Sequence, residues 1–253
     1  MKQTRKAAVK ASADHVGVAY DGIRMMLLNS EIQPGCKISY RQLAEKLDMS
    51  LTPVIQALKR LEYQGLVRHE PNRGYFTEPM SLREVQEIYD MREILETSLL
   101  PDVIKNLDGD AIHRLQRLVD AVSTAKADHA LDRRILKDRE FHLTLAEIAG
   151  KRIPLQMLRY LFDLLYLKYS ASLLFAAAKE AVGAQHHAIF DAVISQELSL
   201  AQKAMADHFK EVKGLALKAL GHMLAGGSTL GCVANDLSQA VVSDINFNRR
   251  RKK

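Results

Sequence analysis

Apolar residues recur at helical spacing through most of the first 65 positions. Two short segments that resemble strands follow before position 78. The spacing of the apolar residues from Val16 to Leu27 predicts a helix that ends before the break at Pro34-Gly35. Ser50 is a suitable N-cap for a later helix. The predicted elements are helices over 13–28, 40–47 and 50–65, and a two-stranded hairpin at 66–69 and 75–77. Residues 1–12 have few large apolar side chains, and we expect them to form a loose arm.

This order of elements, three helices followed by a hairpin, predicts a winged helix-turn-helix domain over residues 13–78. In such a domain the second helix of the turn-linked pair has dimensions that fit the major groove of B-DNA. Four basic residues lie on or beside these elements: Lys59, Arg60, Arg68 and Arg73. A basic run on a helix is also typical of a solvated face, so charge alone favours neither interpretation of Lys59 and Arg60.

Residues 81–224 show helical periodicity without a clear strand signal, which predicts an all-α helical bundle. Ser81 and Glu84 have the spacing of a capping box and open the first helix of the bundle. The predicted helices cover 81–99 or beyond, 110–126, 132–149, 154–174, 181–195 and 198–224. Gly226-Gly227-Ser228 ends regular structure, and residues 225–253 form a C-terminal extension whose basic end is expected to be disordered. The expected fold class is therefore mainly α, a winged helix-turn-helix followed by a bundle.

Composition narrows the class of protein. The chain has 253 residues, 47% of them hydrophobic and 26% charged, which suits two modest globular domains. No run approaches the roughly 18 uncharged apolar residues of a membrane span, and no apolar run follows the basic start. Cys36 and Cys232 lack CxxC spacing, give no indication of a disulfide framework and are compatible with a reducing compartment. We therefore expect a cytoplasmic protein without a membrane partner.

The charge is distributed unevenly along the chain. Residues 1–78 carry 12 basic and 8 acidic residues, and residues 79–248 carry 19 basic and 22 acidic residues. The last five residues, Arg249–Lys253, are all basic. A basic N-terminal part in front of a mildly acidic body favours a polyanion as the partner of the predicted winged helix.

The chain around Ile38–Phe76 resembles the DNA-binding domain of the GntR family along its whole length. The matching elements are PG at 34–35, LAE at 43–45, S-x-T-P-V at 50–54, AL-x-RLE at 57–62, GLV at 65–67 and NRG at 72–74. The helical remainder resembles the FCD ligand-binding domain of the FadR-like subfamily, whose first helix matches IYDMREILE at 88–96. The two resemblances together cover residues 15–224.

The resemblance implies a homodimer that binds a pseudo-palindromic operator in double-stranded DNA. Carried over by position, the DNA-binding candidates are Arg41, Thr52, Arg73 and Gly74. The sequence departs from the family pattern at Leu51 and Ile55, where the family has Arg, and this removes two charge-assisted contacts. Gln56 joins the DNA-binding candidates because its amide can pair with adenine.

The predicted bundle contains a second set of candidates. Asp138 and His142 are four residues apart on one predicted helix and therefore share a face. The resemblance adds His186 and His208, since DREFH, QHHAIFDAV and AMADHF match the family's metal-binding elements, with Gln185 in the place of Glu. Three imidazoles and one carboxylate suit a divalent transition metal ion. The resemblance implies Zn²⁺ or a similar ion as the cofactor.

Each of these residues also has a plainer interpretation. An isolated histidine on an amphipathic helix is more often a surface or satisfied core residue, and only the joint occurrence of all four positions favours a metal site. His187 adjoins His186, and neighbours on a helix point about 100° apart, so only one of the two should face the site.

Arg92 is the effector-binding candidate, because the resemblance places an arginine of the first bundle helix near the effector cavity. There it would neutralise a small carboxylate. An ion pair with Glu93 or Glu96 is the alternative. Tyr166 and Tyr169 either line the same cavity or belong to the bundle core.

These observations favour a DNA-binding transcriptional regulator whose operator affinity is controlled by a small organic acid bound at the metal site. A metal-responsive regulator is an alternative that keeps the same DNA-binding domain. A metalloenzyme that activates water at the Asp/His site is a third hypothesis, but the sequence shows no HExxH-like base and the winged helix would then be unexplained. We therefore expect a regulator and not an enzyme.

Overall fold

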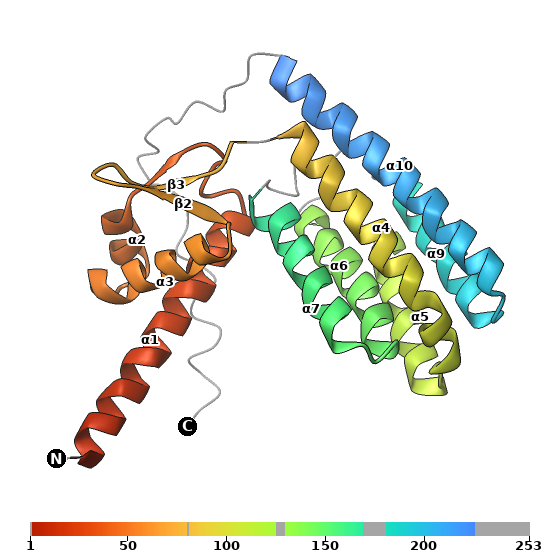
Figure 1. The fold of residues 1–253 in the computed structure, drawn as a ribbon, viewed down its shortest axis with the longest axis horizontal. Coiled ribbons are helices and arrows are strands. Elements are labelled where there is room, and N and C mark those ends of the chain that lie inside the picture. Colours follow the sequence, from red (N-terminus) through yellow and green to blue (C-terminus); the bar gives the residue numbers. More distant parts are fainter. Residues whose placement is uncertain (1, 80, 125–129, 169–180, 226–253) are drawn as a thin grey trace.

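The computed structural model describes residues 2–79, 81–124, 130–168 and 181–225. Helices dominate this part of the chain, and they form two groups that lie side by side (Figure 1). The first group, α1 to β3, carries a small antiparallel sheet, and the second, from α4 onward, is entirely helical. The predicted fold class is confirmed.

The first group is a winged helix-turn-helix. Its helices are α1 (Lys2–Leu28), α2 (Tyr40–Lys46) and α3 (Leu51–Tyr63), and its strands are β1 (Lys37–Ile38), β2 (Val67–Glu70) and β3 (Gly74–Thr77). The strands form one antiparallel sheet in the order β1-β3-β2. Ser39 caps α2 by accepting a hydrogen bond from the Gln42 amide. Ser50 is the N-cap of α3, as predicted, although its side chain makes no capping hydrogen bond.

The predicted hairpin is present but is not the whole sheet, and the arm expected at the start of the chain is wrong. The sheet has a third strand, β1, which is only two residues long and therefore too short to show an alternating pattern. Buried Ile38 pairs with Tyr75 across β3 and brings β1 into the sheet. The loose arm expected over 1–12 is instead the first part of α1, which begins at Lys2. Alanine, lysine and arginine are strong helix formers, so this segment extends the helix without needing an apolar face.

The core of the winged helix lies between α1 and α3. Ile23 and Leu27 of α1 pack with Val54, Leu58 and Leu61 of α3, and all five are fully buried. Gly65 follows α3 with a φ of +68°, a left-handed conformation that favours glycine and lets the chain turn directly into the wing. This packing fixes α3 from behind and leaves its other face exposed.

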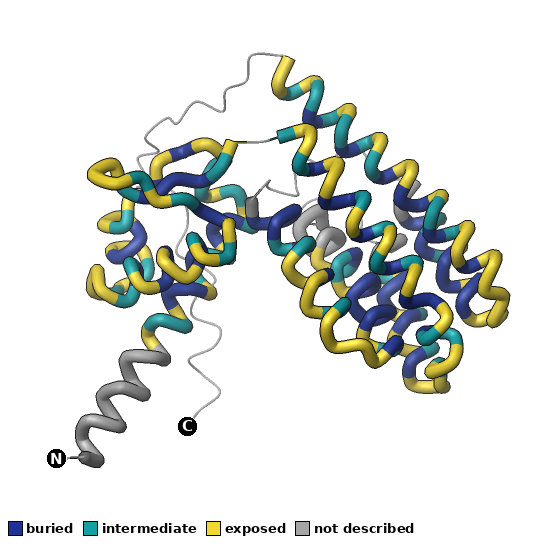
Figure 2. The backbone as a smooth tube through the Cα atoms, in the orientation of Figure 1, coloured by how far each residue is buried: buried dark blue, intermediate teal, exposed yellow. Residues whose placement is uncertain are grey.

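The second group is the helical domain. Its helices are α4 (Leu82–Lys105), α5 (Gly109–Thr124), α6 (Ala130–Ile148), α7 (Arg152–Asp163), the π-helical turn η1 (Leu164–Lys168), α9 (Ala181–Ile194) and α10 (Leu198–Ala225). The predicted cap is present, since the Ser81 hydroxyl accepts a hydrogen bond from the Glu84 amide at 3.3 Å. Figure 2 shows buried positions recurring along the helices of this domain, as expected of amphipathic helices around one core.

One helix differs from its prediction. The uniform helix expected over 154–174 begins earlier, at Arg152, and changes at Asp163 into η1. Residues 169–174 lie outside the described residues. A π-helical turn inserts extra backbone into a helix and often occurs at functional sites, and η1 carries the buried Tyr166.

The two groups contact each other where α1 meets the end of α7. Arg24 of α1 donates two hydrogen bonds to the Asp163 carboxylate, both at 2.8 Å, and a third to the Tyr20 hydroxyl. Tyr20 in turn donates to Gln64, which directly follows α3, at 2.7 Å. The junction therefore links the helical domain to both α1 and the end of α3.

Two further findings concern the cysteines and the hydrophobicity of the helices. Cys36 is buried, whereas Cys232 lies outside the described residues. Among the described helices, none is long and apolar enough to cross a membrane.

Asp163→Asn should weaken the contact between the two domains, because the bidentate ion pair with Arg24 is lost. We expect a loss of about 1 kcal/mol of stability, since the pair is partly exposed, and a fall of about 2–4 °C in Tm. Differential scanning calorimetry measures this change. The control is Glu87→Gln, which removes the exposed ion pair with Arg83 within α4. Equal Tm values for both variants would contradict the assigned role of Asp163.

Candidate functional site

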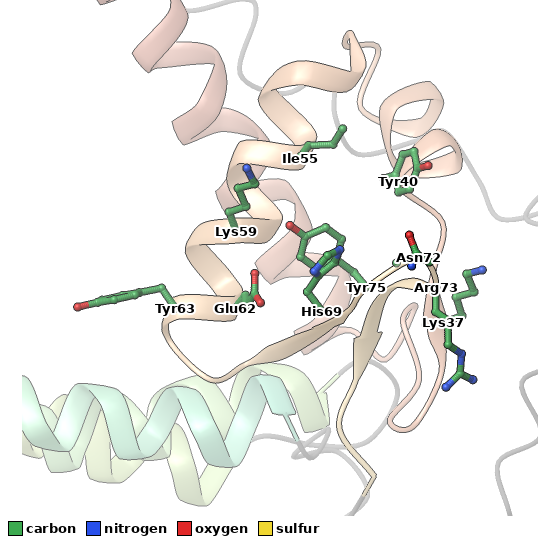
Figure 3. A pocket seen from close by; sticks show the side chains of 11 residues that line it. Lys37, Tyr40, Ile55, Lys59, Glu62, Tyr63, His69, Asn72, Arg73 and Tyr75 are labelled. Atoms are coloured by element: carbon green, nitrogen blue, oxygen red, sulfur yellow. The ribbon is translucent and has the colours of Figure 1, made fainter.

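The winged helix presents a groove between α3 and the wing. The groove has a volume of about 830 Å³ and is lined by Lys37, Tyr40, Ile55, Lys59, Glu62, Tyr63, His69, Asn72, Arg73, Gly74 and Tyr75 (Figure 3). Three of these residues are exposed cations, Lys37, Lys59 and Arg73. Helix, sheet and wing tip thus supply positive charge to one concave surface, which suits the phosphate backbone of a nucleic acid.

The predicted DNA-binding residues lie on or beside this surface. Thr52 and Gln56 are exposed on α3, and the Arg73 side chain is 69% exposed at the wing, where it pairs with Glu70. Gly74 has a φ of +100°, which lets the wing turn at this point. Arg41 is exposed at the start of α2 and lines a neighbouring hollow of about 460 Å³ together with Leu51.

The four basic residues singled out in the sequence separate into two pairs. Lys59 and Arg73 line the groove. The Arg60 guanidinium lies 4.0 Å from the ring centre of Tyr20, on the side of α1. Arg68 pairs with Glu70 and Glu78. The structure adds Lys37 to the groove, which the sequence did not suggest because β1 was not predicted.

The helical domain brings the four predicted metal ligands together at its centre. Asp138 and His142 lie on α6, His186 on α9 and His208 on α10, and all four are buried. The three histidines offer ring nitrogens that lie within 4.8 Å of one another. The Asp138 Oδ1 atom is 3.2 Å from His186 Nε2 and 3.8 Å from His142 Nε2. Four residues from three helices therefore converge on one point.

The residues fit a metal ion, because His142 Nε2 and His186 Nε2 face each other while the Nδ1 atoms of His142 and His208 are engaged elsewhere. His186 Nδ1 is buried and has no hydrogen-bond partner among the described residues. His142 Nδ1 contacts the Glu96 carboxylate, and His208 Nδ1 is 3.1 Å from Gln185 Oε1, so each ring donates outward and directs an Nε2 lone pair inward. His142 Nε2 and His186 Nε2 are 3.2 Å apart. Ligands about 2.0–2.1 Å from a tetrahedral metal ion lie ~3.3 Å apart, close to this separation.

Three further residues surround the ligands and were not assigned this part from the sequence. Glu96 of α4 contacts His142, Gln185 of α9 contacts His208, and the Tyr166 hydroxyl of η1 donates to Asp138 Oδ2 at 2.6 Å. Gln185 also contacts Glu211 of α10. Each of these contacts joins residues 23 or more positions apart, so spacing along one helix could not have indicated them.

The electrostatics favour the metal-binding protonation states of His186, His208 and Asp138. Burial and the neighbouring histidines lower the pKa of His208 well below its ordinary value, and burial lowers the pKa of His186 as well. Burial alone would raise the pKa of Asp138, but the hydrogen bond from His186 and the nearby positive groups outweigh it, so the pKa lies well below its usual range. Neutral imidazoles and an ionised carboxylate are the forms that bind metal ions.

Arg92 of α4 lies beside this cluster and is 1% exposed. Its Nε donates to Glu96 Oε1 at 3.0 Å, which confirms one of the ion pairs considered from the sequence. The guanidinium stacks 3.9 Å from the ring centre of Phe162. Its Nη2 is buried and has no hydrogen-bond partner within the described part of the chain. A buried unpaired donor is costly, so Arg92 retains the capacity to bind an additional acceptor.

The remaining candidates near the cluster are now placed. Tyr166 is buried beside Asp138, whereas Tyr169 lies outside the described residues. His187 turns away from the cluster, with its Nε2 3.6 Å from Asp120. Of the adjacent histidines only His186 therefore faces the site, as the helical geometry predicted.

Comparisons with known proteins agree with both parts of the molecule. The model of the bacterial regulatory proteins of the gntR family matches residues 16–77, and the FCD domain matches residues 87–211. An HTH-type transcriptional regulator from the ttuE-ttuC' intergenic region of Agrobacterium vitis is 30% identical over 144 residues, 56% of this chain and 84% of that protein. The regulator YdhC of Bacillus subtilis is 24% identical over 191 residues, 75% of this chain and 85% of its own length.

Among solved structures, Escherichia coli McbR/YncC has a similar fold. It superposes with a TM-score of 0.71 and 20% identity, covering 81% of this chain and 98% of that chain. Winged helix and helical domain together therefore define a DNA-binding transcriptional regulator with a C-terminal FCD domain. The chain belongs to the gntR family of bacterial regulatory proteins. Its relatives are transcriptional regulators, which favours the expected regulator over the metalloenzyme hypothesis.

Glu96→Gln should destabilise the helical domain, because it leaves the buried Arg92 charge without its nearest counter-ion. We expect the free energy of unfolding to fall by about 3 kcal/mol, the usual cost of breaking a buried ion pair. Urea unfolding followed by circular dichroism measures it. Glu93→Gln on the same helix is the matched control and should change stability by less than about 0.5 kcal/mol, since Glu93 is partly exposed. Similar losses in both variants would refute this role of Glu96.

Proposed function

We propose that this regulator binds its operator with an affinity controlled by a small organic acid held at a metal site in the FCD domain. The observation that carries the proposal is the buried cluster of three histidines and Asp138 next to the unpaired Nη2 of Arg92. Such a combination offers a cation site and a second positive group for an anion.

On the DNA side, we propose that Arg41, Arg73 and the backbone at Gly74 contact phosphates, while Thr52 and Gln56 face base edges. The exposure of these residues around α3 and the wing supports this division. In helix-turn-helix proteins the first helix of the pair lies at the backbone, and the second enters the major groove. Arg41 lies in the first turn of the first of these helices, and Thr52 and Gln56 lie on the second.

On the effector side, Asp138, His142, His186 and His208 would hold a divalent transition metal ion, with Zn²⁺ the first candidate because its ligands are histidine and carboxylate. When bound, such an ion supplies Lewis acidity and open coordination positions for a carboxylate. Glu96 and Gln185 hold two of the imidazole rings in the orientation this requires. The Arg92 fork suits the same carboxylate, since a guanidinium matches its planar geometry.

A continuous set of contacts connects this site with α3. Tyr166 joins Asp138 to η1, and η1 directly follows Asp163 at the end of α7. Asp163 holds Arg24, and Arg24 contacts Tyr20, against which Arg60 of α3 stacks. We propose that effector binding shifts η1 and thereby α3, which changes how well the recognition surface fits the operator.

A homodimer would place two such surfaces on a pseudo-palindromic operator. The exposed apolar residues Ile153, Met157 and Tyr160 are spaced along one side of α7 and offer a surface that a second copy of the chain could cover. A regulator of this kind would act in the cytoplasm, where bacterial chromosomal DNA lies. The expected signature of the dimer is a two-fold repeated half-site.

His186→Ala should abolish metal binding, because it removes a central ligand of the cluster. We expect the protein as purified, or stripped with EDTA and reloaded with Zn²⁺, to hold about one ion per chain, and the variant to hold almost none. Elemental analysis by mass spectrometry measures this. His187→Ala changes the neighbouring histidine, which faces Asp120, and should keep the ion. Equal metal contents in the two variants would show that the cluster is not a metal site.

Arg92→Lys should weaken effector binding while leaving the metal content unchanged, because lysine keeps the charge but loses the planar fork. The metal-loaded protein is screened against small hydroxy and sugar acids by thermal shift, and hits are tested for release of operator DNA by fluorescence anisotropy. We expect a hit to change DNA affinity by about 5-fold or more, and the variant to bind it at least about tenfold more weakly. Arg83→Lys, on an exposed part of α4, is the control.

The same experiment separates the alternatives. A carboxylate that binds Arg92→Lys as tightly as the unchanged protein would contradict the part given to Arg92. If metal loading alone changes DNA affinity and none of the acids does, the chain is a metal-responsive regulator, which the completeness of its buried histidine cluster would also suit.

A further inference from the structure

We propose that α3 recognises A·T base pairs through contacts of Leu51 and Ile55 with thymine methyl groups, assisted by Gln56 bound to adenine. The inference rests on α3 being the recognition helix of the winged domain. It names the bases that this helix selects, which the family membership does not determine.

The first argument is the character of the exposed half of α3. In a helix-turn-helix protein, base edges are contacted mainly by the N-terminal residues of the recognition helix. Here these positions are Leu51, Thr52, Ile55 and Gln56, and none of them carries a charge. Leu51 is 41% exposed at the first position of the helix, and Ile55 lines the groove of Figure 3.

The second argument is the position of the cations. Arg60 is the only arginine of α3, and its guanidinium stacks on Tyr20 of α1, away from the groove. Lys59 lines the groove but lies two turns further along the helix than Leu51. The other exposed cations of this surface, Lys37, Arg41 and Arg73, belong to the sheet, α2 and the wing. The positive charge therefore comes from elements that flank the first half of α3 and not from that half itself, and Arg41 of α2, which shares a hollow with Leu51, is the cation that lies beside its start.

The third argument is the chemistry of the major groove. Guanine offers two acceptors that select arginine or lysine, and neither residue is present in the N-terminal half of α3. Thymine offers a methyl group that aliphatic side chains contact, and adenine offers a donor and an acceptor that match the amide of Gln56. Leu51 is exposed and Ile55 is half-buried at the place where the helix would meet base edges, and thymine methyl groups would cover the apolar surface that both still present to water.

The experiment begins with the purified full-length chain and a pool of synthetic duplexes with about 30 random base pairs, enough for two half-sites one helical turn apart. Repeated selection identifies preferred duplexes. Each thymine of a selected duplex is then replaced by deoxyuridine, which removes only the C5 methyl group. We expect about a fourfold loss of affinity at each contacted thymine, the effect of one buried methyl-sized group.

Variants connect this loss to particular side chains. Leu51→Ala should bind the thymine duplex about as weakly as the unchanged protein binds the deoxyuridine duplex, and should no longer distinguish the two at that position. Leu82→Ala is a matched control, since Leu82 also begins a helix and is 39% exposed, but it lies in α4. Lys59→Ala should lower the salt dependence of binding by about one ion while leaving the methyl effect intact.

The outcomes decide the question. Selected half-sites with G·C pairs at every position sensitive to Leu51→Ala would overturn the proposal, as would equal affinity for thymine and deoxyuridine duplexes. Persistence of the deoxyuridine effect in both Leu51→Ala and Ile55→Ala would also overturn it. A pool from which no sequence is enriched would instead contradict operator binding by the winged helix, and the inference would fail with it.

Discussion

Burial of charge at the centre of the helical domain is the constraint on which the rest of this structure depends. Arg92, Glu96 and Asp138 are all buried, and a buried ion is tolerated only when partners compensate for its lost hydration. The partners come from α4, α6, η1, α9 and α10, so each of these elements must keep its register for the cluster to be satisfied. An apolar core would tolerate small shifts of these helices, whereas this polar cluster does not.

The buried charges are also connected by contacts to residues outside the helical domain. Tyr166 can donate to Asp138 only while η1 keeps its present position, and η1 continues from the residue that holds Arg24. Arg24 and Tyr20 lie against the end of α3 through Gln64 and Arg60. These contacts form a continuous connection between Asp138 and the helix proposed to read the operator. Energetic coupling between two sites is carried by chains of packed and hydrogen-bonded side chains such as this one. The movement that it would transmit is a shift of the helical domain relative to the winged helix.

The sequence predicted those features that depend on local spacing or on a family pattern. The helices of the bundle, the cap at Ser81 and the shared face of Asp138 and His142 follow from helical periodicity. The partners of the ligands could not be predicted in this way, because Glu96 and His142 are 46 positions apart and meet only through tertiary packing. Strand β1 has two residues and η1 has five, so neither is long enough to produce a period of its own.

The surface proposed for base recognition also bears on how regulation could work. Coulombic attraction between cations and phosphates changes slowly with distance, so a small movement of α3 would alter it little. Contacts between aliphatic groups and thymine methyls depend on close approach, and a gap of about 0.5–1 Å removes a quarter to a half of each contact. Base recognition by a helix that carries Leu51 and Ile55 in its first half is therefore sensitive to small displacements of the helix. Slight shifts of α3 through Arg24 and Tyr20 would weaken selective binding while non-selective attraction to DNA persists.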